Sequence, residues 1–112
     1  MRLNERQALS SAFQALGDPT RLAIVERLAR QRVRVTELAL PFAMSLNAVS
    51  KHVKVLERAG LVRRTRRGRE HILELEPAPL QAVTRWAGAQ ERFWRSKLDR
   101  LAVHLKQHPP QS

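Results

Sequence analysis

The stretch MSLNAVSKHVKVLERAGLVRR, residues 44–64, has the pattern of a capped amphipathic helix followed directly by basic residues. Ser45 is a residue type that caps helix N-termini, and Gly60 is typical of the position just after a helix. Apolar residues between them are spaced four and three apart, as on one face of a helix: Val49, Val53 and Leu56. The stretch therefore predicts a helix over about 45–58 with one apolar and one polar face.

The polar face of this helix carries small and hydrogen-bonding side chains that suit contact with DNA. Small residues allow the backbone to approach base edges, an asparagine amide can pair with adenine, and lysines bind phosphates or guanine. The expected DNA-contacting residues of the helix are Ser45, Asn47, Ala48, Ser50, Lys51, His52 and Lys54. The alternative is an ordinary helix surface that faces solvent.

Two strand-like segments follow the helix and flank the sequence RRGR, whose Gly68 permits a tight turn. The expected hairpin covers about 61–75. Its arginines complete the expected DNA-contacting set: Arg64, Arg66, Arg67 and Arg69. Residues 51–71 hold eight Lys and Arg against Glu57 and Glu70, which is +6 of the chain's net +11. Charge concentrated in this way provides affinity for a polyanion and makes that affinity salt-dependent.

The segment before this region predicts two further helices joined by a tight junction. Apolar residues at helical spacing predict the first helix over 5–16. Gly17 then suits a C-terminal cap and Asp18 an N-cap. Proline is tolerated at the first helical position, so a second helix is expected to begin at Pro19 and to cover about 19–29.

The remaining segments are expected to form short or peripheral elements. RVRV at 32–35 alternates as a short strand does. Thr36 is a candidate cap for a short third helix, which Pro41 would shorten or distort because it lacks a backbone donor. PAP at 77–79 is expected to interrupt regular secondary structure between the hairpin and the last helix. A long last helix follows over about 80–107, where apolar residues recur mostly every three or four positions.

This order of elements defines the expected fold class. It is mainly α with a small β-hairpin wing, and two helices joined by a turn and followed by a basic hairpin describe a winged helix-turn-helix. The chain of 112 residues is long enough for one domain and small for two, so residues 1–112 are expected to form a single DNA-binding domain.

Composition limits the partners and the compartment. A net charge of +11 and a pI near 11.7 favour a polyanion, which is DNA, RNA or an anionic membrane surface. No apolar run approaches the length of a membrane span, and the N-terminus lacks the apolar block of a signal peptide. The chain has no cysteine, which fits a reduced cytoplasm, and neither a membrane partner nor a cofactor is expected.

Two stretches resemble the ArsR/SmtB family of bacterial winged-helix transcriptional repressors: FQALGDPTRLAIVERLA at 13–29 and MSLNAVSKHVKVLERAGLVRRTRRGREHILEL at 44–75. Pro41–Phe42 and FWRSKLDRL at 93–101 resemble a subgroup that lacks cysteine metal ligands. The resemblance implies a homodimer joined by the first and last helices, with the 45–58 helix in the major groove. It also implies that the wing reaches the flanking minor groove or backbone.

The apolar stripe of the last helix agrees with a dimer. A stripe with two tryptophans is more than one small domain needs to bury, so a partner helix is expected to cover it. The alternatives are that Trp86, Phe93 and Trp94 fill the protomer's own core or line a ligand pocket. The expected dimer contacts are Leu9, Phe13, Val83, Trp86, Trp94, Leu98, Leu101 and Leu105.

A metal site is not expected. The resemblance implies that relatives bind metals through cysteines on the short helix, where this chain has ELALPF, or through paired Asp, His and Glu on the last helix. The last helix offers Asp99, His104 and His108 in a different spacing. The two histidines are four residues apart and suit either a shared metal ion or an ordinary surface. The sequence identifies no effector.

An enzyme is not expected either, because the chain lacks a glycine-rich phosphate loop, an H-E-x-x-H motif and a nucleophile elbow. The expected function is a sequence-specific repressor that binds an inverted-repeat operator as a homodimer. Three alternatives remain open: a non-specific nucleic-acid-binding or architectural protein, a metal-responsive repressor that uses the C-terminal histidines, and a protein-interaction dimer with incidental charge.

Overall fold

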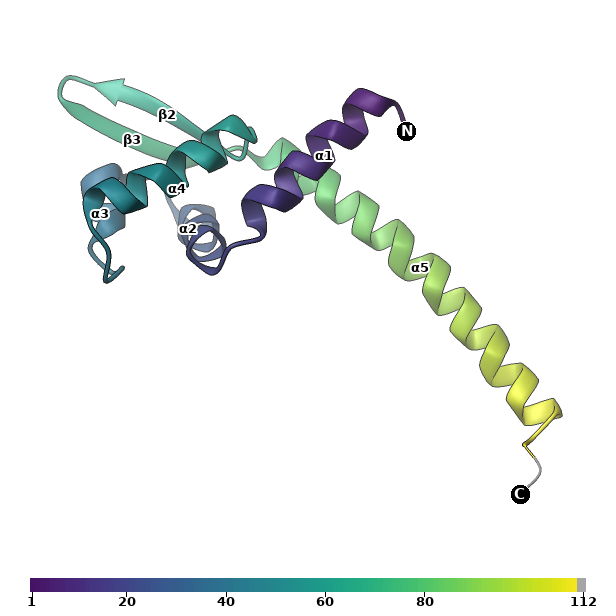
Figure 1. Cartoon of the computed structure of the whole chain (residues 1–112). Helices are drawn as coiled ribbons and strands as arrows, with labels where there is room; N and C mark the ends of the chain where they lie inside the picture. Colours follow the sequence, from purple (N-terminus) through teal and green to yellow (C-terminus); the bar gives the residue numbers. More distant parts are fainter. Residues whose placement is uncertain (111–112) are drawn as a thin grey trace.

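The computed structural model describes residues 1–110 and shows a small helical body from which one long helix extends (Figure 1). The elements are α1 (Leu3–Leu16), α2 (Pro19–Arg30), β1 (Val33–Arg34), α3 (Val35–Ala39), α4 (Leu46–Arg58), β2 (Val62–Arg67), β3 (Glu70–Leu75) and α5 (Pro77–Gln107). The fold is therefore mainly α with a small antiparallel sheet, which confirms the fold class predicted from the sequence.

The three strands form one antiparallel sheet in the order β1-β3-β2. Val62 pairs with Leu75 at the open end of the hairpin, and Arg67 pairs with Glu70 at its tip. Gly68 has a φ of +61° at this tip, in the left-handed region that glycine adopts at little cost. The two-residue β1 pairs with β3, which anchors the base of the wing to the chain before α3.

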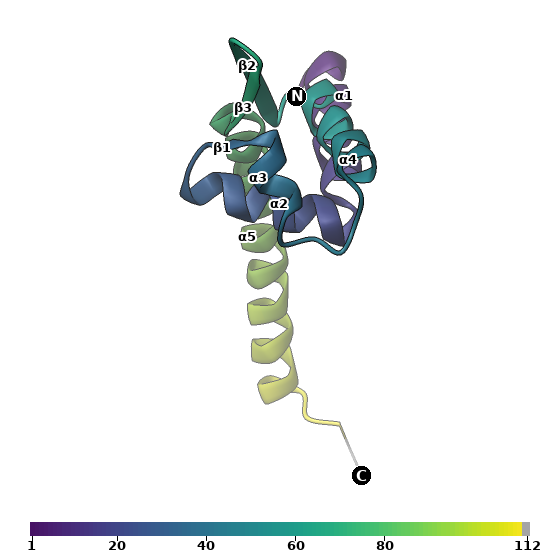
Figure 2. The same cartoon turned by 90° about the vertical axis from the view of Figure 1, so that its left-hand side faces the viewer.

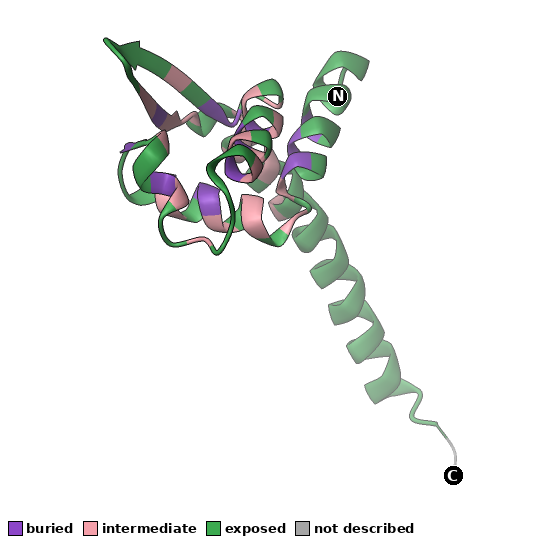
Figure 3. Ribbon diagram, turned by 60° about the vertical axis from the view of Figure 1, so that its left-hand side comes forward, coloured by how far each residue is buried: buried purple, intermediate pink, exposed green. Residues whose placement is uncertain are grey.

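The core lies where α2, α3 and α4 meet the base of the sheet (Figure 3). Its fully buried large side chains come from four of these elements and the turn before β2: Ile24, Leu38, Val49, Val53, Leu56, Leu61 and Leu73. The three apolar residues predicted to form the inner face of the 45–58 helix are all among them. Burial of that face is therefore what holds α4 on the body.

The junction between α1 and α2 forms as the sequence predicts. The Asp18 carboxylate accepts a hydrogen bond from the backbone N–H of Arg21 at 3.1 Å, and Pro19 occupies the first turn of α2. Gly17 closes α1, with its N–H donating to the carbonyl of Gln14 at 3.1 Å. These bonds satisfy backbone groups that a helix end leaves unpaired.

Two predictions about helix boundaries are wrong. Thr36 does not cap α3, because that helix starts at Val35 and Arg34 holds the cap position without a side-chain bond. The helix is short, as expected, but it ends at Ala39, and Pro41 lies in the turn that follows. The segment 77–79 does not interrupt secondary structure, because it is part of α5. Pro77 lies in the first turn of this helix, where its missing N–H is not needed.

The last helix extends well beyond the body (Figures 1 and 2). Only its first turns lie against α1, where the rings of Phe13 and Trp86 meet edge to face with their centroids 5.3 Å apart. None of the residues of α5 is buried, and the described chain measures 70 × 34 × 20 Å. The helix therefore has little within its own protomer to cover its apolar side.

Candidate nucleic-acid interface

The candidate interface is built on α4, the second helix of the helix-turn-helix, which we call the recognition helix. Ser45 caps it: the hydroxyl oxygen accepts a hydrogen bond from the N–H of Ala48 at 3.1 Å. At the other end, Gly60 has a φ of +75°, and the N–H of Leu61 donates to the carbonyl of Leu56 at 3.0 Å. Both ends of the recognition helix are thus fixed by the residue types that the sequence analysis identified.

The predicted DNA-contacting residues of the recognition helix divide into two groups. Ser45, Asn47, Lys51 and Lys54 are exposed, while Ala48, Ser50 and His52 are half-buried. The exposed group lies opposite the buried apolar face, so it is the part of α4 that a DNA groove can reach. Its side chains offer an amide, a hydroxyl and two ammonium groups, which match base edges and phosphates.

The tip of the wing carries three exposed arginines, and they belong to the predicted set: Arg66, Arg67 and Arg69. Arg66 Nε donates to the carbonyl oxygen of Gly68 at 3.0 Å, which holds this side chain against the turn. No ion pair involves Arg66, Arg67 or Arg69 within residues 1–110. Their positive charge is therefore free to attract a polyanion.

The fourth predicted arginine of the wing, Arg64, is engaged elsewhere. Its Nη2 and Nε donate to the same Glu57 oxygen at 2.9 and 3.3 Å, and its side chain is 26% exposed. Arg63, a further basic residue of the hairpin outside the predicted contact set, pairs with Glu74 at 3.0 Å and with Glu76 at 3.2 Å. The structure thus separates the basic residues of the hairpin into paired residues near its base and unpaired residues at its tip.

His52 also faces the protein rather than the open side of α4. Its Nδ1 lies 3.3 Å from Nη1 of Arg21 and 3.8 Å from a carboxylate oxygen of Asp18, and its side chain is 22% exposed. The sequence analysis did not single out Arg21. The only signal for it was its place in GDPTRL, three residues after the cap, where a side chain can turn back toward the helix junction.

The surroundings of the Asp18 carboxylate perturb its titration. The hydrogen bond from the backbone N–H of Arg21 lowers the pKa of Asp18 below its ordinary 3.8. The nearby His52 and the Arg21 side chain lower the pKa further, while partial desolvation opposes them. The ionised form is therefore the one that caps α2.

The predicted dimer-contact residues are mostly accessible. Exposed members are Phe13, Trp86, Trp94, Leu98, Leu101 and Leu105, whereas Val83 is half-buried and Leu9 is only 8% exposed. Leu9 is covered because α1 packs on α5 within the protomer. Beside the stripe, the Lys97 ammonium lies 4.8 Å from the centre of the Phe93 ring, a cation–π contact.

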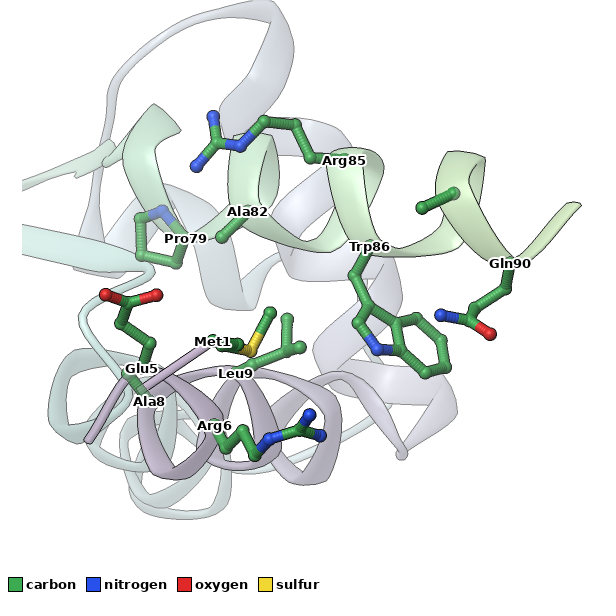
Figure 4. A pocket seen from close by; sticks show the side chains of 11 residues that line it. Met1, Glu5, Arg6, Ala8, Leu9, Pro79, Ala82, Arg85, Trp86 and Gln90 are labelled. Atoms are coloured by element: carbon green, nitrogen blue, oxygen red, sulfur yellow. The ribbon is translucent and has the colours of Figure 1, made fainter. Parts of the chain in front are cut away.

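A hollow of about 550 Å³ lies between α1 and the first turns of α5 (Figure 4). Met1, Leu9, Pro79 and Trp86 give it an apolar floor, with charged side chains such as Arg85 at its rim. The hollow is open and lies on the side of the molecule that carries the predicted dimer contacts. Trp86 is thus placed at the surface of this groove and not in the core.

The structure brings two of the three candidate metal ligands close together. The rings of His104 and His108 lie with their centroids 4.7 Å apart near the end of α5. Within residues 1–110, no three His, Cys, Asp or Glu residues lie close enough to hold a metal ion together. Over the same residues, none of the helices combines the length and apolar character needed to cross a bilayer.

The recognition helix and its basic wing define a winged helix-turn-helix protein, and comparison with known proteins identifies its family. Residues 16–65 match a family described as a helix-turn-helix domain. The HTH-type transcriptional regulator Rv2034 of Mycobacterium tuberculosis is 44% identical over 87 residues, which are 78% of each chain. A transcriptional repressor SmtB homolog of Synechocystis sp. is 39% identical over 69 residues, 62% of this chain and 52% of that one.

Solved structures agree with this assignment. A crystal structure of an ArsR family transcriptional regulator has a TM-score of 0.75 at 41% identity, covering 81% of this chain and 94% of the other. An ArsR-like regulator from Rhodococcus sp. RHA1 has a TM-score of 0.70 at 29% identity, covering 97% and 100%. The chain belongs to the ArsR/SmtB family of DNA-binding transcriptional regulators, and it is not an enzyme, as the sequence predicts.

Proposed function

We propose that this regulator is a sequence-specific repressor that binds an inverted-repeat operator as a homodimer in the bacterial cytoplasm. The observation that carries the proposal is the joint placement of the capped recognition helix and the unpaired arginines at the tip of the wing. A helix of this kind lies in the major groove and selects bases, while the arginines bind the backbone or the adjacent minor groove. Repression follows from occupation of promoter DNA.

Within this proposal, the exposed residues of α4 make the groove contacts. Asn47 pairs with an adenine edge, and Lys51 and Lys54 bind phosphate or guanine. Ser45 donates its hydroxyl hydrogen to a phosphate while its oxygen caps the helix. Ala48 and Ser50, which are half-buried, line the close approach of the helix to the bases. Arg64 and His52 position the wing and the helix instead of touching DNA.

The homodimer is proposed from the exposed stripe of α5. Trp94, Leu98, Leu101 and Leu105 follow at intervals of four, three and four residues and are all exposed. That spacing lets two helices pack side by side, and α1 with the neighbouring groove extends the same surface. Two recognition helices about 34 Å apart would then enter successive major grooves, so the operator has two inverted half-sites.

Selection of bound fragments from a random double-stranded DNA library tests the function. The expected result is one enriched inverted repeat, bound at least about a thousandfold more tightly than random DNA of the same length at physiological salt. The +6 charge of residues 51–71 would by itself give binding without preference. Equal affinity for the enriched and random fragments at every salt concentration would therefore establish a non-specific binder and overturn the proposal.

A further inference from the structure

The guanidinium group of Arg21 connects three helices. Its Nε donates to the carbonyl oxygen of Ala15 at 2.5 Å, and its Nη2 donates to the carbonyl oxygen of Gln14 at 3.2 Å. Both carbonyls belong to the last turn of α1, where a helix leaves carbonyl groups without partners four residues further on, and the Gln14 carbonyl also accepts from the N–H of Gly17. The remaining nitrogen, Nη1, lies 3.3 Å from Nδ1 of His52 in the recognition helix. One side chain of α2 therefore holds the end of α1 and the middle of α4.

The chemistry of the two side chains fixes the direction of the contact with α4. A guanidinium has only donors, so Nδ1 of His52 accepts the hydrogen bond and the hydrogen of the neutral ring is on Nε2. Asp18 completes the group, because its carboxylate accepts from the backbone N–H of Arg21 and lies 3.8 Å from the same Nδ1. An Nδ1 that accepts from Arg21 has no hydrogen for the Asp18 carboxylate, so the guanidinium of Arg21 is the group of α2 that holds His52.

Apolar packing between α1 and α4 is incomplete beside this contact. A hollow of about 280 Å³ is lined by Ser11 and Ala15 of α1, by Val55 and Arg58 of α4, and by Arg21. The fully buried residues of α4 fix its inner face in the core formed with α2, α3 and the sheet. Ala15 of α1 is buried in the same core, so the hydrogen bonds of the Arg21 guanidinium, which we call the polar bridge, act together with packing to position the recognition helix relative to α1.

The bridge is continuous with the contact between α1 and α5. Phe13, whose ring meets Trp86 of α5, directly precedes Gln14, whose carbonyl accepts from Arg21. A chain of contacts thus runs from Trp86 through the last turn of α1 and the Arg21 guanidinium to His52. Such a chain can carry a displacement of one helix to another only if its members are physically joined, as they are here.

We propose that Arg21 is a positioning residue that sets the recognition helix against α1 and thereby links the α1–α5 surface to DNA recognition. The inference rests on the proposed function, because it concerns the placement of the same helix. Arg21 acts through His52 and does not touch DNA. Its loss leaves the charge pattern of α4 and the wing intact but displaces the groups that select bases.

The test compares affinity for the fragment enriched by the wild-type protein with affinity for random DNA of the same length. Arg21→Gln and His52→Leu should each lower affinity for the enriched fragment about tenfold, or about 1.4 kcal/mol, and change affinity for random DNA less than about twofold. His52→Asn keeps an acceptor near the position of Nδ1 and should retain most of the preference. Combining Arg21→Gln with His52→Leu should cost little more than either change alone, because both break one bond.

Arg30→Gln is the matched control, since it removes the same charge from the far end of α2 and Arg30 is exposed. It should leave both affinities within about twofold of the wild type. Arg21→Lys keeps the charge with fewer directed donors and serves as the milder variant if Arg21→Gln lowers the melting temperature strongly. Wild-type preference in all folded variants, whatever their melting temperatures, would overturn the inference. Failure of the wild-type protein to prefer any fragment would overturn the proposed function itself and remove the basis of the inference.

Discussion

Arg64 of the wing binds one carboxylate oxygen of Glu57 in the recognition helix through two guanidinium nitrogens, at 2.9 and 3.3 Å. The pair joins the two parts of the candidate interface, α4 and β2, at the base of the hairpin. His71 lies next to it, with Nδ1 3.5 Å from Nη1 of Arg64. Arg64, which the sequence predicts to contact DNA, therefore joins the recognition helix to the wing through Glu57.

Replacement of Arg64 should affect DNA binding differently from replacement of Arg67. Arg67→Gln should reduce the slope of log affinity against log salt by about one, because one phosphate contact is lost. Arg64→Gln should leave that slope nearly unchanged while weakening binding through a looser wing. Titration of a labelled duplex at four salt concentrations checks both slopes. A full unit of slope lost with Arg64→Gln would show that this arginine does contact phosphate.

The Arg64–Glu57 pair should also contribute to folding stability. The side chains are 26% and 28% exposed, so solvent weakens the attraction, and the coupling energy should be about 0.5–1 kcal/mol. A double-mutant cycle with Arg64→Gln and Glu57→Gln, followed by urea unfolding, measures it. The pair Arg95 and Glu91 on α5 is more exposed and provides the comparison, with an expected coupling below about 0.5 kcal/mol.

Two substitutions of Ser45 are expected to affect folding stability and DNA affinity differently. Ser45→Ala removes the acceptor for the N–H of Ala48, and it should lower the free energy of unfolding by about 1 kcal/mol. Ser45→Asp keeps the cap and should preserve stability, yet it places a negative charge beside DNA phosphates and should weaken DNA binding more than Ser45→Ala does. Chemical denaturation and duplex titration of both variants measure the two effects. Equal DNA affinity in Ser45→Asp and the wild type would place this end of α4 away from the phosphates.

The α5 stripe should determine the association state. Leu98→Gln with Leu101→Gln removes apolar groups from both partners of the proposed dimer, and it should raise the dimer dissociation constant by at least about a hundredfold. Arg100→Gln changes an exposed residue between them and should leave the mass unchanged. Light scattering after size exclusion measures the mass of each variant. A wild-type protein that is monomeric while it binds the enriched fragment fully would exclude the dimer.

The folded chain should lose stability in acid because the Asp18 carboxylate becomes protonated. The pKa of Asp18 is lower in the folded chain than the ordinary 3.8, so its contribution is complete above that value and is lost as the pH falls through the folded pKa. Asn is also a good cap but does not titrate, which makes Asp18→Asn the control. The difference in melting temperature between the wild type and Asp18→Asn should therefore shrink as the pH falls below about 3.8. A difference that stays constant to pH 2 would contradict this assignment.

Local patterns made most of the fold predictable. The four- and three-residue spacing of Val49, Val53 and Leu56 predicts α4, and the structure buries all three completely. Asp18 and Ser45 cap their helices as predicted, because these caps bond N–H groups only three residues away. The errors at Thr36 and Pro77 have a common cause, since each is compatible both with the edge of a helix and with its first turn.

The roles of individual charged residues were less predictable, because they depend on partners that are distant in sequence. Arg64 and Arg67 are equivalent in the sequence RRTRR, yet only the register of β2 places Arg64 beside Glu57. His52 and Arg21 are 31 residues apart and meet only after α2 and α4 pack. The exposure of an apolar residue depends on such packing too, because Leu9, a predicted dimer contact, is only 8% exposed where α1 packs on α5.

The bare surface of α5 has a consequence for how the amount of protein controls its target. If two chains must meet before both half-sites are held, promoter occupancy at low abundance rises with the square of the number of molecules in the cell. Halving the pool at cell division would then reduce the bound fraction up to fourfold. Because no residue of α5 is buried within one chain, gene expression would in this way depend steeply on the number of molecules in the cell.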